Sequence, residues 1–358
     1  MPRVALKDIA AKVGYSKNTV SLALRGDPQI PDRTRSTILK VAQEMGYERN
    51  AVTSQLMAQL RSTRSRETAR IALINANTQR DAFTNHPTIP AYVEGAKRRA
   101  AYLGYETVDF WLSDPEQTPD QLITQFEKQN IQGVILIGLM KQNRLPDRYY
   151  RVWSDYPCVV TGVRTHEPAL SFACVDHHHL AMNAVNQALA LGYQRPGLVL
   201  DEMIDHLVDR RFSAGFLRGQ QTLPKDRRIP PLFAVDEARR DAKVFYKWFD
   251  RHQPDVLITL YNVVFDWIKA RKLKVPKDVG VIQLEWRAAE PHIAGMNQHN
   301  DLTGANAFDM LISLIHGQEK GAPAFPRATL ASGTWTDGNS VKPQIKSKSA
   351  IKRMTVKS

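Results

Sequence analysis

The chain has 358 residues, of which 43% are hydrophobic, and its formal net charge at pH 7 is +13. No apolar run approaches the roughly 20 residues needed to span a bilayer, and no export signal is seen, so a membrane protein is excluded and a cytoplasmic one is expected. Two cysteines, Cys158 and Cys174, are too few for a disulfide framework and are expected to be buried thiols.

The positive charge is concentrated at the two ends of the chain. Residues 1–66 contain 12 Lys/Arg and 5 Asp/Glu, and residues 341–358 contain 6 Lys/Arg and no acidic residue. The part between them, 67–340, is therefore close to neutral. Basic ends on a neutral body are typical of a protein whose ends meet a polyanion. For 341–358, a solvated and disordered tail is expected, and nonspecific attraction to phosphates is the alternative.

Three short helices are predicted within the first fifty residues. Apolar residues in Leu6–Val13 are spaced by three and four along one helix face, and Gly14 supplies the left-handed geometry that ends a helix. Ser16 is a good N-cap for a second helix, Lys17–Leu24. A third helix is expected over 32–46. Two short helices joined by a glycine turn indicate a helix-turn-helix, with a generic three-helix bundle as the alternative.

The second helix of a helix-turn-helix lies in the major groove of DNA, with its N-terminal residues facing the base edges. In this chain those residues are Lys17, Asn18, Ser21 and Leu22. A lysine suits the acceptors on guanine, and an asparagine can form a bidentate pair with adenine. The pattern therefore predicts sequence-specific DNA binding.

A set of short motifs runs without a gap through the same region: Asp8-Ile-Ala-Ala, Val13-Gly14-Tyr-Ser16, Thr19-Val20-Ser21, Thr34-Arg35, Gly46-Tyr47 and Asn50-Ala51. Their order and spacing resemble the signature of the lactose repressor and galactose repressor family of bacterial transcription regulators. One position departs from that signature, because the family usually has an arginine where this chain has Leu22. A leucine can touch only apolar features such as a thymine methyl group, so the usual operator sequence cannot be assumed.

The resemblance implies a DNA-binding headpiece over residues 1–49 and a hinge helix with a linker over 50–66. In the family, a leucine of the hinge wedges into the minor groove, and Leu56 stands at that position. A plain helical linker is the alternative for this stretch. The residues expected to contact DNA are Lys7, Ser16, Lys17, Asn18, Thr19, Ser21, Leu22, Arg25, Thr34, Tyr47, Asn50 and Leu56.

Strands and helices alternate from Arg70 onward. Strands are predicted at 71–74, 107–112, 133–137, 158–161, 197–200, 256–259 and 279–284, and helices at 91–103, 119–129, 180–191, 212–221 and 264–270. Such alternation predicts parallel sheets of the doubly wound type, with a ligand at the carboxyl ends of the strands. The expected fold is an all-α helix-turn-helix headpiece followed by an α/β core (67–340) of two doubly wound parallel-sheet lobes.

The resemblance to the family extends more weakly through this core, on Asp176, Gly192-Tyr193, Gly215-Phe216, Val275-Pro-Lys-Asp278, Gln298, Gly304 and Ala307. The core of the family resembles periplasmic sugar-binding proteins. The resemblance therefore implies a homodimer on a pseudo-palindromic operator, controlled by a small-molecule effector, a sugar or a sugar derivative, between the lobes. The expected effector-binding residues are Asn75, Arg210, Arg211, Asn262, Glu285 and Trp286. Residues without ligand contact at these positions, or a regulator without an effector, are the alternatives.

Signals of catalysis and of metal binding are weak. His177-His178-His179 are consecutive, so on a helix they point about 100° apart and cannot chelate one ion. No phosphate-binding loop, nucleophile elbow or zinc-protease motif occurs, so no enzyme, metal or cofactor is expected. Three other classes are disfavoured: a solute-binding protein by the basic N-terminal region, a sugar-processing enzyme by the missing motifs, and a DNA-packaging protein by the large core.

Overall fold

The computed structural model describes residues 6–24, 29–45, 47 and 69–344. The chain divides into two compact units, Met1–Arg66 and Glu67–Ser358. The headpiece, residues 1–49, is part of the first unit, and the core, residues 67–340, is part of the second. The predicted hinge and linker over 50–66 lie outside the described residues, as does the tail beyond residue 344.

Three helices form the described part of the headpiece: α1 (Leu6–Val13), α2 (Lys17–Leu24) and α3 (Asp32–Glu44). The bounds of α1 and α2 agree with the prediction, and α3 begins at the predicted residue. Each helix contributes a fully buried side chain, Ile9, Val20 and Ile38, to one small core. The helix-turn-helix prediction is confirmed, whereas the predicted end of α3 at Gly46 lies outside the described residues.

The turn between α1 and α2 has the backbone that its glycine predicts. Gly14 has a φ of +70°, in the left-handed region, and its N–H donates to the carbonyl of Ala10 at 3.0 Å. A Cβ at Gly14 would meet no atom within 4 Å, so the glycine is favoured by its backbone angle and not by a lack of space. The turn therefore closes α1 and places Ser16 at the start of α2.

The first lobe of the core is built on a six-stranded sheet with the order β10-β5-β4-β3-β1-β2, in which every pairing is parallel. Its strands are β1 (Arg70–Asn75), β2 (Glu106–Trp111), β3 (Ile131–Ile137), β4 (Cys158–Thr161), β5 (Ser171–Val175) and β10 (Ala328–Ala331). The helices of this lobe are α5 (Ala82–Asn85), α6 (Ile89–Tyr102), α7 (Pro119–Lys128), α8 (Tyr150–Asp155) and α15 (Asn300–Gly317).

Both faces of this sheet are covered by helices. Ile71 and Leu73 of β1 are buried in a cluster with side chains of α6 and α15. Ala72 and Ile74 of the same strand are buried in a second cluster with side chains of α7 and α8. Because successive side chains of a strand point to opposite faces, a strand buried on both sides has the continuous apolar run that predicted β1.

The second lobe is built on a five-stranded sheet with the order β11-β9-β8-β7-β6, parallel except for the antiparallel pair of β11 and β9. Its strands are β6 (Pro196–Val199), β7 (Val256–Thr259), β8 (Gly280–Gln283), β9 (Gly295–Asn297) and β11 (Thr334–Thr336). The helices are α9 (His177–Ala190), α10 (Glu202–Leu207), α11 (Arg211–Gly219), α12 (Val235–Arg240), α13 (Lys243–His252) and α14 (Val263–Ala270), with short 3-10 turns at Gln220–Thr222 and Lys225–Arg227; a further 3-10 turn, Asp147–Tyr149, precedes α8 in the first lobe.

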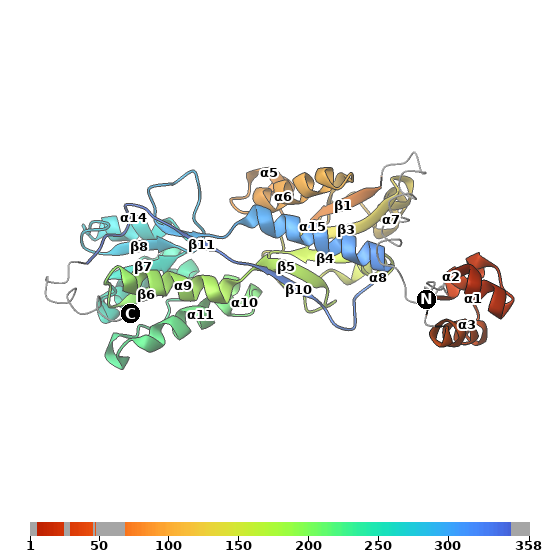
Figure 1. Cartoon of the computed structure of the whole chain (residues 1–358). Helices are drawn as coiled ribbons and strands as arrows, with labels where there is room; N and C mark the ends of the chain where they lie inside the picture. The colour runs from red at the N-terminus through yellow and green to blue at the C-terminus, as the bar shows by residue number, and fades with distance from the viewer. Residues whose placement is uncertain (1–5, 25–28, 46, 48–68, 345–358) are drawn as a thin grey trace, which may run out of the picture. The chain divides into compact units, whose positions relative to one another are not determined.

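The lobes are connected by several passages of the chain. Within residues 69–344, the chain crosses after β5 into α9, after β9 into α15, and after β10 into β11 (Figure 1). α15 packs on α6 in the first lobe, where a Cβ at Gly304 would overlap the backbone of Tyr92. α11 packs on α9 in the second lobe, where a Cβ at Gly215 would overlap the backbone of His178. Two helix pairs thus depend on glycines that allow the backbones to approach closely.

The predicted two-lobed, doubly wound fold is confirmed, but several elements are not predicted by the sequence patterns. The strands β5, β9, β10 and β11 are short, and all five residues of β5 are buried, so no alternation marks it. The 18-residue helix α15 was also missed. Its buried side contains small residues such as Thr303 and Gly304, while Leu302 lies exposed, so no clean apolar stripe stands out.

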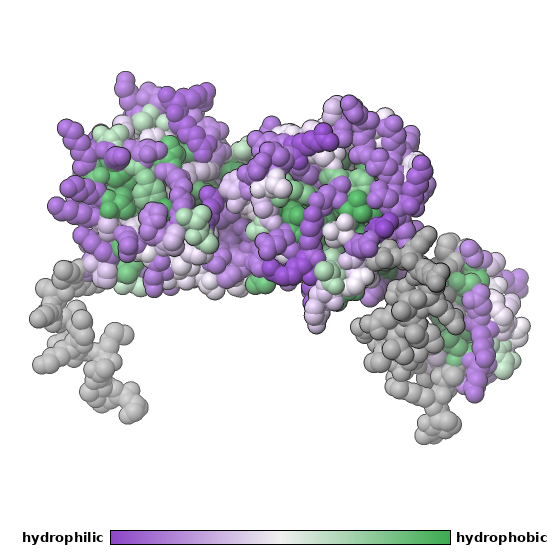
Figure 2. Space-filling model, turned by 90° about the horizontal axis from the view of Figure 1, so that it is seen from above, coloured by the Kyte–Doolittle hydropathy of each residue, from purple (hydrophilic) through white to green (hydrophobic). Residues whose placement is uncertain are grey.

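The surface is mainly hydrophilic, and the two cysteines of the core are buried, as the composition predicts. On the face seen in Figure 2, hydrophilic side chains predominate and hydrophobic ones form smaller patches. Cys158 and Cys174 are both buried free thiols, and burial raises the pKa of each. None of the helices in the described ranges is long and apolar enough to cross a membrane.

Candidate functional site

The first turn of α2 presents polar side chains to the solvent. Lys17 and Asn18 are exposed, whereas Val20 of the same helix is buried in the headpiece core. The Ser16 hydroxyl accepts the backbone N–H of Thr19 at 3.0 Å, which satisfies one of the free N–H groups at the helix start. The exposed pair therefore stands on a capped and anchored helix turn.

The other predicted DNA contacts differ in exposure. Lys7 is exposed, and the remaining described ones are half-buried: Thr19, Ser21, Leu22, Thr34 and Tyr47. The side chains of Leu22 and Tyr47 pack against the buried cluster of the headpiece, so part of each is engaged in holding the helices together. Arg25, Asn50 and Leu56 lie outside the described residues.

A cavity of about 390 Å³ lies between the two lobes of the core. Its lining includes residues at or directly after the ends of β3 and β4 in the first lobe, 138–140 and 161–163, and residues after β7 and β8 in the second lobe, 260–263, 285 and 287. The cavity thus lies at the carboxyl ends of parallel strands from both sheets, which is where doubly wound folds bind ligands.

Two glycines shape the first-lobe wall of the cavity. Gly138 has a φ of +94° and Gly162 a φ of +90°, both in the region that favours glycine. A Cβ at Gly162 would lie 3.3 Å from the ring of Tyr92, and one at Gly138 would lie 2.9 Å from Ile89. The chain can therefore turn sharply after β3 and β4 and leave the space above the strand ends open.

The walls of the cavity are largely hydrocarbon and aromatic. Tyr92, Leu139 and Val163 contribute from the first lobe, and Leu207 and Phe212 from the second. All of them are at most 7% exposed. A ligand in this space would exchange water for apolar surface over most of its area.

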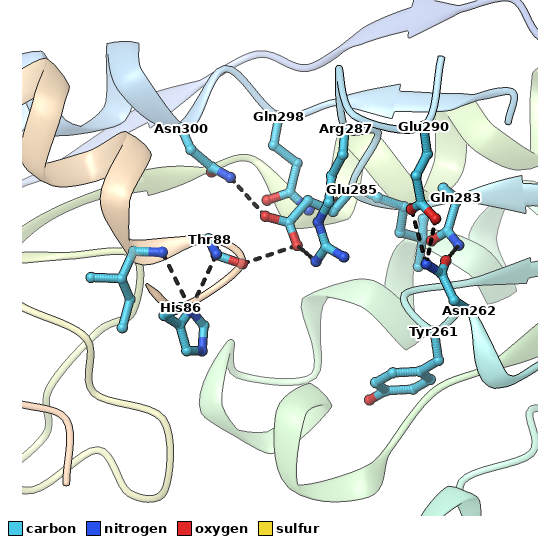
Figure 3. Close-up of polar contacts among 12 residues, drawn as sticks. His86, Thr88, Tyr261, Asn262, Gln283, Glu285, Arg287, Glu290, Gln298 and Asn300 are labelled. Atoms are coloured by element: carbon cyan, nitrogen blue, oxygen red, sulfur yellow. Dashed lines mark hydrogen bonds and ion pairs between the residues drawn. The ribbon is translucent and has the colours of Figure 1, made fainter. Parts of the chain in front are cut away.

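The carboxylate of Glu285 connects the two lobes at the edge of the cavity (Figure 3). It accepts hydrogen bonds from the Thr88 hydroxyl at 3.1 Å and from the Asn300 amide at 2.9 Å, both in the first lobe. The guanidinium of Arg287, its neighbour in the second lobe, pairs with it at 2.8 Å. Glu285 is buried and has three donors, so its charge is compensated within the protein.

Asn262 is held by protein groups in the same way. Its carbonyl oxygen accepts from Gln283 Nε2 at 2.8 Å, and its amide nitrogen donates to both carboxylate oxygens of Glu290, at 2.8 and 2.9 Å (Figure 3). Asn262 and Glu285 therefore both line the cavity, as expected for effector-binding residues, but each already has protein partners.

Three residues of the cavity lining have a buried polar atom without a partner among the described residues. These atoms are Oγ1 of Thr161, at the end of β4, Nδ1 of His177, at the start of α9, and Nε of Arg287, after β8. The His177 ring lies edge-on to Phe212, with 4.7 Å between the ring centroids. Burial, together with the positive charge of Arg211, lowers the pKa of His177 to about 3, so the imidazole is neutral at physiological pH.

The expectation that Arg210 and Arg211 line the cavity is not met, because Phe212 occupies this part of the wall. The Arg211 guanidinium donates to the carbonyl of Val208 at 3.0 Å and lies over the ring of Phe172. Arg210, with a φ of +57°, begins α11 and pairs weakly with a surface carboxylate. Both side chains are thus engaged outside the cavity.

Asn75 and Trp286 also lie outside the cavity lining. The Asn75 side chain is buried at the end of β1, where its amide donates to the carbonyls of Gln79 and Arg80 and so fixes the loop after that strand. Trp286 stands between Glu285 and Arg287, which do line the cavity. Its indole Nε1 is buried and has no hydrogen-bond partner among the described residues.

Several lining residues escaped the sequence analysis. The sequence patterns place His177 only in a histidine triplet that cannot chelate one ion, and Thr161 only at the end of a strand. His86, Thr88 and Arg287 carry no motif. A search for polar residues within three positions of each strand end would have found Thr161 and Arg287. No group of three or more His, Cys, Asp or Glu able to hold a metal ion is found among the described residues.

Comparisons with known proteins agree with this architecture. The model of the bacterial regulatory proteins of the lacI family matches residues 5–50, and that of the periplasmic binding protein-like domain matches residues 185–341. The regulator reg1 of Streptomyces lividans is 26% identical over 292 residues, covering 77% of this chain and 79% of the relative. The regulator CelR of Thermobifida fusca is 20% identical over 348 residues, 88% and 93% of the two chains.

Solved structures show the same fold. The transcriptional regulator CelR in complex with cellobiose superposes with a TM-score of 0.57 at 18% identity, covering 94% of this chain and all of the other. The lac repressor dimer bound to operator and the anti-inducer ONPF superposes with a TM-score of 0.55 at 17% identity, covering 95% of this chain and all of the other. At these identities the likeness concerns the fold alone.

Proposed function

Because this chain belongs to the lactose repressor and galactose repressor family of DNA-binding transcription regulators, and is not an enzyme, we propose that it is a repressor that binds a pseudo-palindromic operator as a homodimer. A small molecule in the cavity between the lobes controls this binding. The protein acts in the cytoplasm, where its DNA is.

The capped first turn of α2 is the observation that carries the proposal. Lys17 and Asn18 are exposed on a helix whose opposite side is fixed in the headpiece core. In the major groove, the lysine would donate to the acceptors of guanine, and the asparagine would form a bidentate pair with adenine. Ser16 and Thr19 would contribute contacts to phosphate, which position the helix without specifying sequence.

The remaining segments take their roles from the family resemblance. The headpiece is residues 1–49, and the hinge and linker are 50–66, with Leu56 as a wedge that unstacks one base step in the minor groove. Residues 67–340 bind the effector and form the dimer. The basic tail, 341–358, adds attraction to phosphates that depends on salt and not on sequence.

Coupling between effector and DNA passes through the arrangement of the lobes. Glu285 joins them by its hydrogen bonds to Thr88 and Asn300. A ligand that moves the lobes apart would have to break these hydrogen bonds, and a ligand that leaves the lobes in place would preserve them. A change in lobe arrangement alters how two subunits meet, and hence whether both headpieces reach one operator. The resemblance favours a sugar or a sugar derivative as effector, and the cavity's own side chains select further among small molecules.

Selection from a pool of random duplexes, with the purified full-length protein, tests the proposal. A pseudo-palindromic sequence with two half-sites is expected, because a two-fold symmetric dimer reads the same bases twice. A variant with both Lys17 and Asn18 changed to alanine serves as the control and should recover no preferred sequence. Recovery of no preferred sequence by the unchanged protein, at low salt and without effector, would contradict the proposal.

A further inference from the structure

A loop of the second lobe, on the side away from the cavity, is rich in exposed cations. Residues 269–277, which lead from the end of α14 toward β8, contain five Lys/Arg and no Asp or Glu. All five are exposed: Lys269, Arg271, Lys272, Lys274 and Lys277. α14 begins beside the cavity at Val263, and its eight residues span about 12 Å, so the loop lies at the far end of the helix.

The loop is held in place by apolar side chains that alternate with its lysines. Leu273 and Val275 are half-buried and pack against the cluster that joins α13, α14 and the second sheet. The backbone N–H of Lys274 donates to the carboxylate of Asp278 at 2.8 Å, and the N–H of Asp278 donates to the carbonyl of Lys274 at 2.8 Å. The backbone that carries the lysines is therefore fixed before a partner binds, so only side chains lose freedom on binding.

Most of these cations have no acidic partner within residues 69–344. The Arg271 guanidinium pairs with Asp250 of α13 at 2.6 Å and lies over the ring of Tyr246. The amino groups of the four lysines form no ion pair and no hydrogen bond in that range. Lys269 lies in the last turn of α14, where the helix dipole favours a cation, but the other three lysines lie beyond the helix. Their charge thus compensates no group of the described protein.

The last described residues of the chain lie beside the same loop. Gly280, at the start of β8, contacts the side chain of Tyr193, since a Cβ at this glycine would lie 2.6 Å from the tyrosine hydroxyl. That hydroxyl accepts the backbone N–H of Lys342 at 3.2 Å, and Lys342 is exposed. The sequence after Gln344 contains five more Lys/Arg and no acidic residue. Two segments distant in sequence thus bring positive charge to one end of the second lobe, which we call the basic end: Lys269, Arg271, Lys272, Lys274, Lys277 and Lys342.

A polyanion with a regular array of charges fits the basic end. A lysine ammonium is a compact charge on a flexible stem and lacks the fixed fork of an arginine, so it suits contacts with backbone phosphates, which carry no sequence information. Interfaces between proteins are instead depleted in lysine and are built around aromatic and apolar side chains. Because lysines make up most of the exposed residues of this loop, DNA is a better match than an acidic protein.

We propose that the basic end is a second DNA-binding surface, which holds the phosphates of a duplex segment other than the operator without regard to its sequence. The choice of DNA as the polyanion rests on the proposed function, whereas the surface itself consists of core residues that line no part of the cavity. A dimer bound to its operator through the headpieces has two such surfaces. It can therefore hold two segments of DNA together.

A capture experiment with the full-length protein tests the inference. A short duplex that contains only the selected operator is immobilised and saturated with protein, and a fluorescent duplex of scrambled sequence is then added. The unchanged protein should retain the second duplex at about 50 mM salt and release it at about 300 mM, because contacts with phosphates displace counterions and weaken steeply as salt increases.

The triple variant Lys272→Gln, Lys274→Gln and Lys277→Gln removes three charges whose amino groups have no partner within residues 69–344, so its thermal unfolding should be unchanged. It should bind the operator within about twofold of the unchanged protein and hold the second duplex roughly tenfold more weakly or less. The matched control changes three exposed lysines of the first lobe, Lys128, Lys141 and Lys320, to glutamine. This control should retain the second duplex as the unchanged protein does.

Three results would overturn the inference. The unchanged protein could retain no second duplex at low salt, or both triple variants could lose it equally. A polyglutamate peptide of the same total charge could also displace the duplex at a lower concentration than the duplex itself, which would assign the surface to an acidic protein. In each case a recovered operator would still support the proposed function. If no operator is recovered, the proposed function fails, and binding of the scrambled duplex alone to the two triple variants still tests the basic end.

Discussion

The DNA-reading turn of the headpiece and the cavity of the core are specified by the sequence in opposite ways. The first consists of consecutive residues, Ser16 to Asn18, on an eight-residue helix. The second collects side chains from positions as distant as His86 and Gln298, brought together by two sheets and their crossings. A site formed by residues that are neighbours in sequence can be predicted from local rules of helix capping and periodicity. A site formed by residues that are distant in sequence can be identified only when the positions of the strand ends in the fold are known.

The two regions also differ in how they are stabilised. The described headpiece buries one small cluster, in which Ile9, Val20 and Ile38 are fully buried, so single local interactions matter there. The core buries both faces of two sheets, and its stability depends on close packing between helices that are distant in sequence. Changes in one region should therefore leave the other intact.

The largest effect is expected for Gly304→Val in α15. A Cβ at this position would overlap the carbonyl of Tyr92 in α6, and two packed backbones cannot yield by a side-chain rotation. The core should lose about 4 kcal/mol or more of its free energy of unfolding. Tryptophan fluorescence in urea measures it, because the six tryptophans all lie in the core, between residues 111 and 335.

Gly317→Val is the control for this change, since a Cβ at the end of the same helix would meet only the flexible side chain of Glu319. Its urea midpoint should stay close to that of the unchanged protein. Amide exchange in α2 should be the same in both variants. Loss of headpiece protection in Gly304→Val would show that the two regions do not fold independently.

The core should also lose stability on acidification, through His177. Its folded-state pKa is lowered to about 3 from an ordinary value of 6.5, so the unfolded chain binds a proton in this window that the folded chain does not. The stabilising effect is complete above pH 6.5 and is lost as the pH falls toward 3, at up to about 1.4 kcal/mol per pH unit. Urea unfolding at pH 7 and pH 5 measures it.

His177→Gln should reduce this dependence by the contribution of one proton, whereas His179→Gln, an exposed neighbour on the same helix, should retain it. An equal slope in both variants would show that His177 is protonated in the folded protein. The inference that the His177 imidazole is neutral in the folded protein would then be wrong.

Glu285→Ala should have an intermediate effect. It removes the acceptor of Thr88 and Asn300 and leaves Arg287 without its partner, which should lower the free energy of unfolding of the core by about 2 kcal/mol. The effector response should disappear while operator binding without effector persists. Glu94→Ala, which breaks only a surface contact with Arg98 at 3.7 Å, should change the unfolding free energy little. A retained effector response would exclude Glu285 from the coupling between the lobes.

Ser16→Ala should have the smallest effect on stability, and only the headpiece should be affected. The variant loses the N-cap of α2 and with it about 1 kcal/mol of headpiece stability. We expect faster amide exchange in α2 and unchanged tryptophan fluorescence of the core. Ser36→Ala on the exposed side of α3, whose hydroxyl bonds only within its own helix, is the matched control and should not speed that exchange.

Local patterns predicted the elements that have clear ends. α1, α2, β4 and β7 have the predicted bounds, because a cap, a glycine or a short apolar run between polar residues marks them. α15 has no such stripe, since its buried face includes small residues that fit against α6. Glycine contacts of this kind depend on the partner helix, which the local sequence does not reveal.

The cavity shows the same limit. Asn262 and Glu285 were found from family positions, and both line it, yet their partners Gln283, Glu290 and Thr88 come from the fold. Trp286 was expected to stack on a ligand but is not part of the cavity lining. The buried polar atoms of the lining that have no hydrogen-bond partner could not be predicted from the sequence, because their surroundings depend on the fold.

The specificity ratio of Asn18→Ala tests the central claim that α2 reads a DNA sequence. Binding of the full-length protein to its selected operator, and to a scrambled duplex of equal length, is titrated at one salt concentration by fluorescence anisotropy. The account predicts a loss of affinity for the operator of roughly 5- to 150-fold, about 1–3 kcal/mol, with affinity for the scrambled duplex unchanged. Equal loss on both duplexes, or no loss on either, would contradict it.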